Sequence, residues 1–293
     1  MIDFEYYRPL HLEEALSLCN EYGEEARLLA GGTELINEIR SGKTRPRQVI
    51  DLKHIKELDG YAFSSEGLKL GALVKVREVE TSGEIRNYFP ALSHAAGTIG
   101  SVQIRNKATI AGNICRASPS ADSIPPLIAL GSTLTVHSLQ GDKKVFLEDF
   151  LVGPGKTILK PGEILTEIFI PYQPSFSAST YIKLSPRQAM DLAVVGVAVN
   201  IRSDTTLERC TDVKIVLGAV APTAIRARRA EAVLSGSKIS DDIFGEAAHV
   251  ASEEARPVSD IRASEWYRRR MVEVLVKRAL NECWMKIVSG RHN

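Results

Sequence analysis

Two glycine-containing segments hold the residues best suited to binding a phosphorylated ligand. The first is Leu28-Leu29-Ala30-Gly31-Gly32-Thr33-Glu34-Leu35, where a short apolar run meets two glycines and then a helical pattern. Glycines let the backbone approach a ligand closely, and amides at a helix start bind phosphate. Thr33 can cap that helix or donate its hydroxyl to the same anion. Ordinary strand–turn–helix corners have the same pattern, so this segment alone leaves both interpretations open.

The second segment is Gln103-Ile104-Arg105-Asn106-Lys107-Ala108-Thr109-Ile110-Ala111-Gly112-Asn113-Ile114, which is polar and has no clear period. Thr109 and the pair Gly112-Asn113 are suited to wrapping a ligand with backbone amides and short side chains. Arg105 stands apart from these small residues, so we expect it to pair with a neighbouring carboxylate rather than with a phosphate. Downstream, Asp122 opens a predicted helix, either as a helix-start carboxylate or as an acceptor for a ligand hydroxyl.

Familiar catalytic and metal signatures are missing. Gly153-Pro154-Gly155-Lys156-Thr157 resembles the end of a P-loop, but Phe150 stands where that motif needs glycine. No G-x-G-x-x-G follows a predicted strand, and no H-E-x-x-H or G-x-S-x-G occurs. We therefore name no catalytic residue on this chain.

The four cysteines, Cys19, Cys115, Cys210 and Cys283, lie 96, 95 and 73 residues apart. Zinc and iron–sulfur sites usually draw ligands from close pairs such as C-x-x-C. We expect four buried or half-buried thiols and no metal on this chain.

Composition narrows the class of protein. Of 293 residues, 44% are hydrophobic and 25% are charged, as in globular proteins with a packed core. The 37 basic and 36 acidic residues give a net charge of +1, so no overall field attracts nucleic acid. The longest apolar run, residues 192–199, is far shorter than the ~20 residues of a membrane span, and residues 1–5 are unlike a secretion signal. We expect a cytoplasmic α/β protein.

The elements that must position these segments form two parts. Strands over 27–30 and 49–52, with a helix over 33–40 between them, predict a βαβ-like unit, and a second α/β segment runs from 68 to 170. Residues 171–177 contain two prolines and two serines and are typical of a linker.

After the linker, three strand-like runs at 180–184, 193–201 and 213–220 are followed by helical patterns, which indicates an α+β module. The last helical pattern carries one apolar stripe, made of Val272, Val276, Ala279, Cys283 and Ile287. The basic runs 226–229 and 268–270 are expected on solvated helix faces.

Taken together, the two glycine-containing segments resemble the FAD-binding medium subunit of molybdenum hydroxylases. That family includes xanthine dehydrogenases, carbon monoxide dehydrogenases and nicotinate- or aldehyde-oxidising relatives. The resemblance covers essentially the whole chain, and the Met190-Asp191 and Ala221-Pro222-Thr223 segments look most like bacterial xanthine dehydrogenase FAD subunits. It continues through Ser120-Ala121-Asp122-Ser123, Gly153-Pro154-Gly155-Lys156-Thr157, Arg187-Gln188-Ala189-Met190-Asp191 and Gly218-Ala219-Val220-Ala221-Pro222-Thr223.

The resemblance implies an α+β fold. A p-cresol methylhydroxylase-type FAD-binding fold of two α/β subdomains would be followed by a C-terminal three-stranded antiparallel sheet with helices. The FAD-binding domain would span 1–173, with subdomains of about 1–54 and 55–173, and the C-terminal domain would span 178–293.

The resemblance also implies site residues. The first loop would bind the FAD pyrophosphate through Leu28, Leu29, Ala30, Gly31, Gly32, Thr33, Glu34 and Leu35. The second loop would contact phosphate and ribityl groups through Thr109, Ile110, Ala111, Gly112 and Asn113. Asp122 would accept a hydrogen bond from the cofactor, Ile99 would lie against the flavin ring, and Ile158 and Lys183 would approach that ring.

Two of these positions carry a question. The family often has glycine where this chain has Ala111, whose methyl group enters a loop near the cofactor. Lys183 would favour the reduced, anionic flavin; the alternative is a surface lysine on a strand.

The resemblance finally implies an assembly. A large subunit would hydroxylate the substrate at a molybdenum cofactor, and two 2Fe–2S clusters on a small subunit would carry the electrons to this FAD. NAD⁺ or another acceptor would take them, in what we expect to be a dimer of heterotrimers that oxidises purines (xanthine or hypoxanthine). The alternatives are a carbon monoxide, nicotinate or aldehyde dehydrogenase subunit, a free-standing flavin reductase, and a flavin-binding module that serves assembly.

Overall fold

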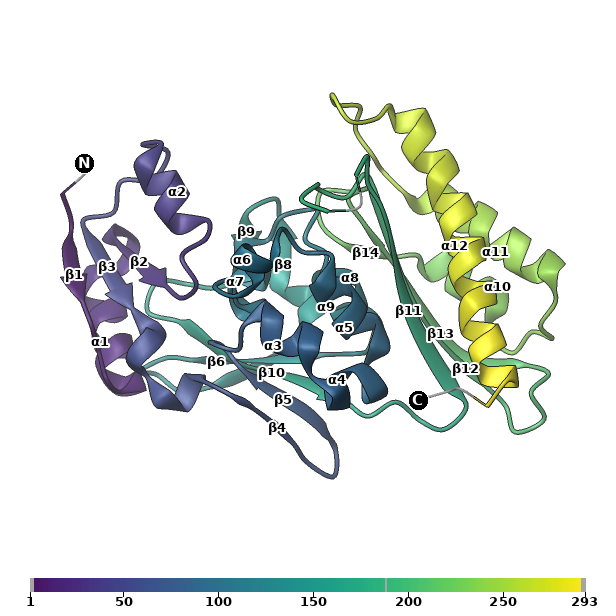
Figure 1. The fold of residues 1–293 in the computed structure, drawn as a ribbon, viewed down its shortest axis with the longest axis horizontal. Coiled ribbons are helices and arrows are strands. Elements are labelled where there is room, and N and C mark those ends of the chain that lie inside the picture. The colour runs from purple at the N-terminus through teal and green to yellow at the C-terminus, as the bar shows by residue number, and fades with distance from the viewer. Residues whose placement is uncertain (1–2, 188, 291–293) are drawn as a thin grey trace.

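A computed structural model describes residues 3–187 and 189–290 of the chain. In these residues the strands form three main sheets that follow one another along the chain, each accompanied by helices (Figure 1). Gln188, which belongs to one of the segments of the family resemblance, lies outside the described residues.

The N-terminal part is a three-stranded parallel sheet in the order β1-β3-β2. Its β2–α2–β3 succession is the predicted βαβ unit, and Leu29, the last residue of β2, lies opposite Asp51 of β3. The glycines of the first loop therefore follow the carboxyl end of a parallel strand. The elements are β1 (Glu5–Tyr7), α1 (Leu12–Tyr22), η1 (Gly23–Glu25), β2 (Ala26–Leu29), α2 (Leu35–Arg40) and β3 (Gln48–Asp51).

The middle part is a five-stranded antiparallel sheet in the order β4-β5-β10-β6-β7. On its two central strands, Leu68 lies opposite Ile170 and Leu70 opposite Ile168, and all four side chains are fully buried in the largest core. The strands are β4 (Tyr61–Phe63), β5 (Gly67–Gly71), β6 (Thr133–His137), β7 (Lys143–Phe146) and β10 (Ile164–Pro171), with η2 (Leu52–His54) and η3 (Lys56–Leu58) before them and a small hairpin of β8 (Leu151–Gly153) and β9 (Lys156–Thr157) beside them.

Helices join the middle part to the C-terminal part. Helices α5 (Pro90–Gly97) and α8 (Ile124–Ala129) contact other helices of the middle part and also strands of the C-terminal sheet (Figure 1). The helices of the middle part are α3 (Val76–Thr81), α4 (Gly83–Tyr88), α5 (Pro90–Gly97), α6 (Val102–Arg105), α7 (Ile110–Arg116), α8 (Ile124–Ala129) and α9 (Leu147–Phe150).

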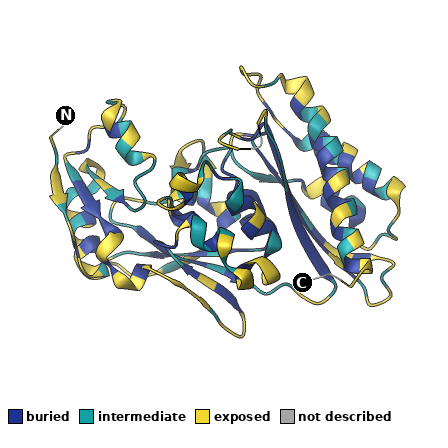
Figure 2. Cartoon of the chain, viewed as in Figure 1, coloured by how far each residue is buried: buried dark blue, intermediate teal, exposed yellow. Residues whose placement is uncertain are grey.

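The C-terminal part begins after the chain leaves β10 at Pro171. Its antiparallel sheet has the order β11-β12-β13-β14, so a two-residue strand, β14, adds to the three strands that the sequence predicts. Every residue of the predicted apolar stripe on α12 is buried against this sheet, and Figure 2 shows the dark blue face of the helix turned toward it. The elements are β11 (Ser177–Leu184), β12 (Val195–Ser203), β13 (Cys210–Gly218), β14 (Ile225–Arg226), α10 (Arg228–Leu234), α11 (Asp241–Glu254) and α12 (Glu265–Val288).

Three sequence-based expectations about single residues are wrong. Arg226 lies on strand β14 rather than on a helix, and its half-buried guanidinium pairs with Glu231 (2.7 Å). Arg268 is not solvated: its buried guanidinium donates to the carbonyls of Val194 (2.7 Å) and Ala219 (3.1 Å) and pairs with Asp260 (2.8 Å). It thereby joins the start of α12 to the ends of two strands. Cys115 is exposed, whereas Cys19, Cys210 and Cys283 are buried as expected.

Two further features of the part of the chain that the structure describes concern membranes and metals. No helix there has the length and apolar character needed to cross a membrane. No group of three or more His, Cys, Asp or Glu side chains there is arranged to hold a metal ion.

The Phe150 side chain tests the packing of the middle part, because it is fully buried while Phe146, four residues earlier, is 55% exposed. Replacing Phe150 with Ala removes a buried ring and leaves a cavity, so the free energy of unfolding should fall by about 3–5 kcal/mol. Phe146→Ala is the matched control and should change it by less than about 1 kcal/mol. Denaturant unfolding followed by circular dichroism measures both; equal losses would contradict the assigned packing.

Candidate functional site

The two glycine-containing loops touch each other through their backbones. A Cβ atom added to Gly31 would lie 2.1 Å from the carbonyl oxygen of Lys107 and 2.9 Å from the Cα of Ala108. Only glycine leaves room for so close an approach. The structure therefore brings together two segments that lie more than 70 residues apart in the sequence.

The first loop leads from β2 into α2. Gly32 has φ +73°, a left-handed conformation that favours glycine. The first hydrogen bond of helical type runs from the amide of Ile36 to the carbonyl of Gly32 (3.1 Å). The amides of residues 33–35 precede it and therefore have no carbonyl partner within the helix. The helix starts at Leu35, two residues later than predicted, and its N-cap residue Glu34 makes no side-chain capping bond. Thr33 is therefore not the helix cap.

The second loop leads into α7 and is anchored to the chain just before α3. Thr109 is the N-cap of α7, and its hydroxyl accepts a hydrogen bond from the amide of Gly112 (3.0 Å). The amide of Val76 donates to the Ala108 carbonyl (2.9 Å), which fixes the start of the loop. Ala111 is 4% exposed and belongs to the main core, so its methyl group is covered by protein.

Asp122 and Lys183 form a buried ion pair between the middle and C-terminal parts. Lys183 Nζ lies 2.8 Å from Asp122 Oδ2 and donates to the carbonyl of Thr98 (3.1 Å), while the Tyr181 hydroxyl donates to Asp122 Oδ1 (2.7 Å). Burial raises the pKa of Asp122 above its ordinary value, and the positive charge of Lys183 opposes that rise. Lys183 is 7% exposed, so the alternative of a surface lysine is wrong.

Two other predicted site residues, Ile99 and Asn113, are linked to this ion pair through neighbouring residues. Ile99, nearly buried, directly follows the Thr98 carbonyl that Lys183 contacts. Asn113 on α7 accepts a hydrogen bond from Ser123, the neighbour of Asp122 (2.7 Å). Ile158 comes from a different element, just after the β8–β9 hairpin, where its amide donates to the carbonyl of Phe150 (3.0 Å).

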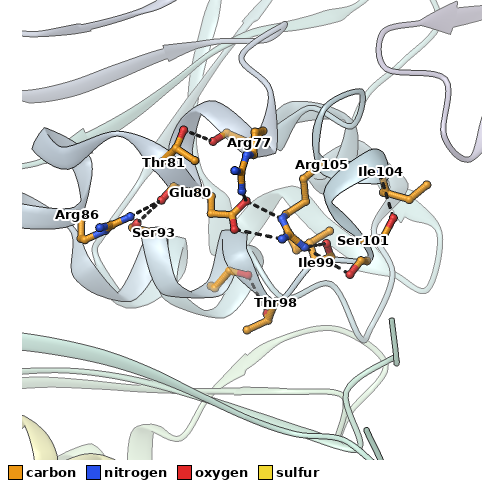
Figure 3. A network of polar contacts seen from close by, with 12 residues as sticks. Arg77, Glu80, Thr81, Arg86, Ser93, Thr98, Ile99, Ser101, Ile104 and Arg105 are labelled. Atoms are coloured by element: carbon orange, nitrogen blue, oxygen red, sulfur yellow. Dashed lines mark hydrogen bonds and ion pairs between the residues drawn. The ribbon is translucent and has the colours of Figure 1, made fainter. Parts of the chain in front are cut away.

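Arg105 pairs with a carboxylate, as the sequence predicts. Its Nε and Nη2 atoms lie 2.6 Å and 3.1 Å from the two carboxylate oxygens of Glu80 (Figure 3). This arrangement is the bidentate geometry that a guanidinium favours. Arg105 therefore pairs with a carboxylate of the protein and not with a ligand phosphate.

Sequence reasoning missed two residues that tie the site together. Arg116, at the end of α7, lies 3.5 Å from Glu34 and 3.1 Å from Glu38, so it links the helices that follow the two loops. Tyr181, on β11 of the C-terminal sheet, donates a hydrogen bond from its hydroxyl to Asp122. Arg116 was detectable in principle, because Glu34 and Glu38 stand one helical turn apart and imply a basic partner.

The donors gathered here fit a cofactor that carries a pyrophosphate. The segments that lead into α2 and α7 come together where Gly31 meets Lys107, and backbone amides at helix starts are good donors to phosphate oxygens. Beyond them, a buried ammonium lies beside Thr98 and Asp122. The site therefore has one end with donors suited to phosphate and another end that carries a buried positive charge.

Family comparison identifies the class to which this arrangement belongs. Residues 2–173 match the family described as the FAD binding domain in molybdopterin dehydrogenase. Residues 180–283 match the CO dehydrogenase flavoprotein C-terminal domain. The chain belongs to the FAD-binding medium subunits of the molybdenum hydroxylases.

Individual relatives agree with this assignment. The medium subunit is 33% identical to the glyceraldehyde dehydrogenase medium chain of Sulfolobus acidocaldarius, covering 96% of this chain and 98% of that one. It is 31% identical to the xanthine dehydrogenase FAD-binding subunit of Escherichia coli O157:H7, covering 96% and 97%. A solved chain of carbon monoxide dehydrogenase from Hydrogenophaga pseudoflava superposes with a TM-score of 0.93 at 31% identity over 97% of this chain and 98% of that one. The chain is therefore an oxidoreductase subunit with the α+β fold of that structure.

Gly31→Ala tests whether the contact between the loops matters for the cofactor. The added methyl group must push Lys107 away, so we expect the medium subunit to bind FAD at least about tenfold more weakly. Gly83→Ala is the matched control, since an added Cβ there meets no atom within 4 Å. Titration of the flavin-free chain with FAD measures both variants. Native affinity in Gly31→Ala would show that the loop contact is unimportant for binding.

Proposed function

We propose that this medium subunit holds FAD with the pyrophosphate on the two glycine-containing loops and the flavin ring beside Ile99 and Lys183. The observation that carries this proposal is the contact of Gly31 with Lys107, which places both loops at one point. The first loop contributes residues 28–35 and the second residues 109–113. Asp122 offers a further lone pair to the cofactor, and Ile158 covers the ring from the segment after the hairpin.

The two-domain division belongs to the same proposal. An FAD-binding domain over 1–173, with subdomains near 1–54 and 55–173, is followed by a C-terminal domain over 178–293. Its support is the change of sheet between Pro171, the end of β10, and Ser177, the start of β11. The domains would meet at Asp122 and Lys183, beside the proposed flavin ring.

The chain's own residues would bind and position the cofactor rather than carry out bond chemistry. When bound, the flavin supplies the exchange between single electrons and a hydride pair. The backbone amides of the loops would neutralise the pyrophosphate, and the Lys183 ammonium would attract negative charge that develops on the ring. Such a role requires no nucleophile and no general base, in agreement with the sequence.

The partners follow from the role of a medium subunit. We propose that a small subunit supplies electrons from 2Fe–2S clusters, that a large subunit holds the molybdenum cofactor, and that the heterotrimers pair as a dimer in the cytoplasm. NAD⁺ or another acceptor would take the electrons. The names of the relatives, a medium chain and an FAD-binding subunit, support a multi-chain complex.

Purine oxidation is the substrate chemistry that we propose for the complex. Its support is the likeness of the Met190-Asp191 and Ala221-Pro222-Thr223 segments to bacterial xanthine dehydrogenase FAD subunits. Relatives named for glyceraldehyde, xanthine, nicotinate and carbon monoxide share 30–33% identity with this chain, so aldehyde, nicotinate and carbon monoxide oxidation are the alternatives to test beside it.

Purification of the tagged chain from its native cells tests the role in electron transfer. We expect it to bring down one large and one small partner, and we expect the complex to reduce NAD⁺ or a dye when xanthine or hypoxanthine is added. The isolated chain should show little NADH–dye activity. A partner-free chain with full NADH–dye activity would instead make it a free-standing flavin reductase.

A further inference from the structure

The turn of residues 98–100 links α5 to α6 and carries Ile99. Gly100 adopts φ +50°, and the amides of Thr98 and Ile99 donate back to the carbonyls of Ala95 (3.0 Å) and Ala96 (3.2 Å). These bonds occupy the amides of Thr98 and Ile99. The carbonyls of residues 98–100 must therefore accept hydrogen bonds from donors outside the turn.

Two cationic side chains from opposite sides satisfy those carbonyls. Arg105 Nη1 donates to the carbonyls of Ile99 (3.0 Å) and Gly100 (3.4 Å), as Figure 3 shows for Ile99. Lys183, from the C-terminal sheet, donates to the carbonyl of Thr98 (3.1 Å). Three consecutive carbonyls are thus held between a guanidinium and an ammonium.

Glu80 on α3 fixes the guanidinium that makes these bonds. Both of its carboxylate oxygens face Arg105, whose side chain is 9% exposed, and Arg77 adds a second ion pair at 2.9 Å. Although burial opposes it, the hydrogen bonds from Arg105 and Arg77 hold the pKa of Glu80 below its ordinary value. The carboxylate therefore stays charged at neutral pH, and Arg105 keeps one orientation.

A buried ion pair of this kind is a poor source of stability, because desolvation of both charges offsets their attraction. What it does supply is a fixed geometry. We propose that Arg105 is a positioning residue for the flavin ring, holding the 98–100 turn against Lys183 so that the ring keeps one place beside Ile99. This inference rests on the proposed FAD site and adds to it a residue that does not itself touch the cofactor.

Arg105→Met and Arg77→Met form the decisive pair of variants, because each removes one ion pair from Glu80 but only Arg105 contacts the turn. In the full chain, Arg105→Met should weaken FAD binding by about tenfold or more, because the turn beside the ring loses the hydrogen bonds that hold it in place. It should also shift the visible flavin absorption band and the midpoint potential. Arg77→Met should keep the FAD dissociation constant within about twofold and leave the band and potential unchanged.

Further variants separate positioning from folding. Arg105→Lys keeps the charge but cannot reproduce the planar fork, so it should give an intermediate FAD affinity. If Arg105→Met does not fold, Glu80→Gln keeps the side-chain shape and should shift the flavin band in the same direction as Arg105→Lys. The inference is overturned if FAD affinity in these variants falls only in proportion to thermal stability, or if the flavin spectrum stays native. If the unaltered chain takes up no FAD, it is the proposed function that fails.

Discussion

The contact between Gly31 and the Lys107 carbonyl is the constraint on which the proposed site depends. No side chain fits there, since an added Cβ would lie 2.1 Å from the carbonyl oxygen. The contact joins the loop between β2 and α2 to the segment between α6 and α7. Arg116 strengthens the junction by reaching from α7 to Glu34 and Glu38 on α2. The pyrophosphate site that we propose, built from backbone amides, depends on this meeting of the two loops.

A buried ion pair, rather than a close backbone contact, joins the C-terminal sheet to the middle part. Asp122 receives bonds from Tyr181 and Lys183 on β11, and Lys183 also reaches the 98–100 turn that Arg105 holds from the other side. Groups buried in this way must stay paired, because an orphaned charge would cost several kcal/mol.

Local patterns in the sequence predict the elements well but predict contacts poorly. The βαβ unit and the stripe on α12 follow from glycine positions and from apolar periodicity, and the structure confirms them. The predicted linker over 171–177 is shorter in the structure, because Pro171 ends β10 and Ser177 begins β11. Strand β14 has only two residues and leaves no periodic signal. The partner of Arg105 was predictable only as a carboxylate, because Glu80 lies 25 residues away. Arg268 was placed wrongly since a charge pattern does not show where a long side chain reaches.

The most direct test of the account is the absorption spectrum of the purified full chain, followed by mass identification of the molecule that acid releases. The account predicts the bands of oxidised flavin and the mass of FAD, or a colourless chain that gains both when FAD is added. A chain that is colourless and takes up no added FAD would contradict it, because the two loops would then share a family fold without sharing its cofactor.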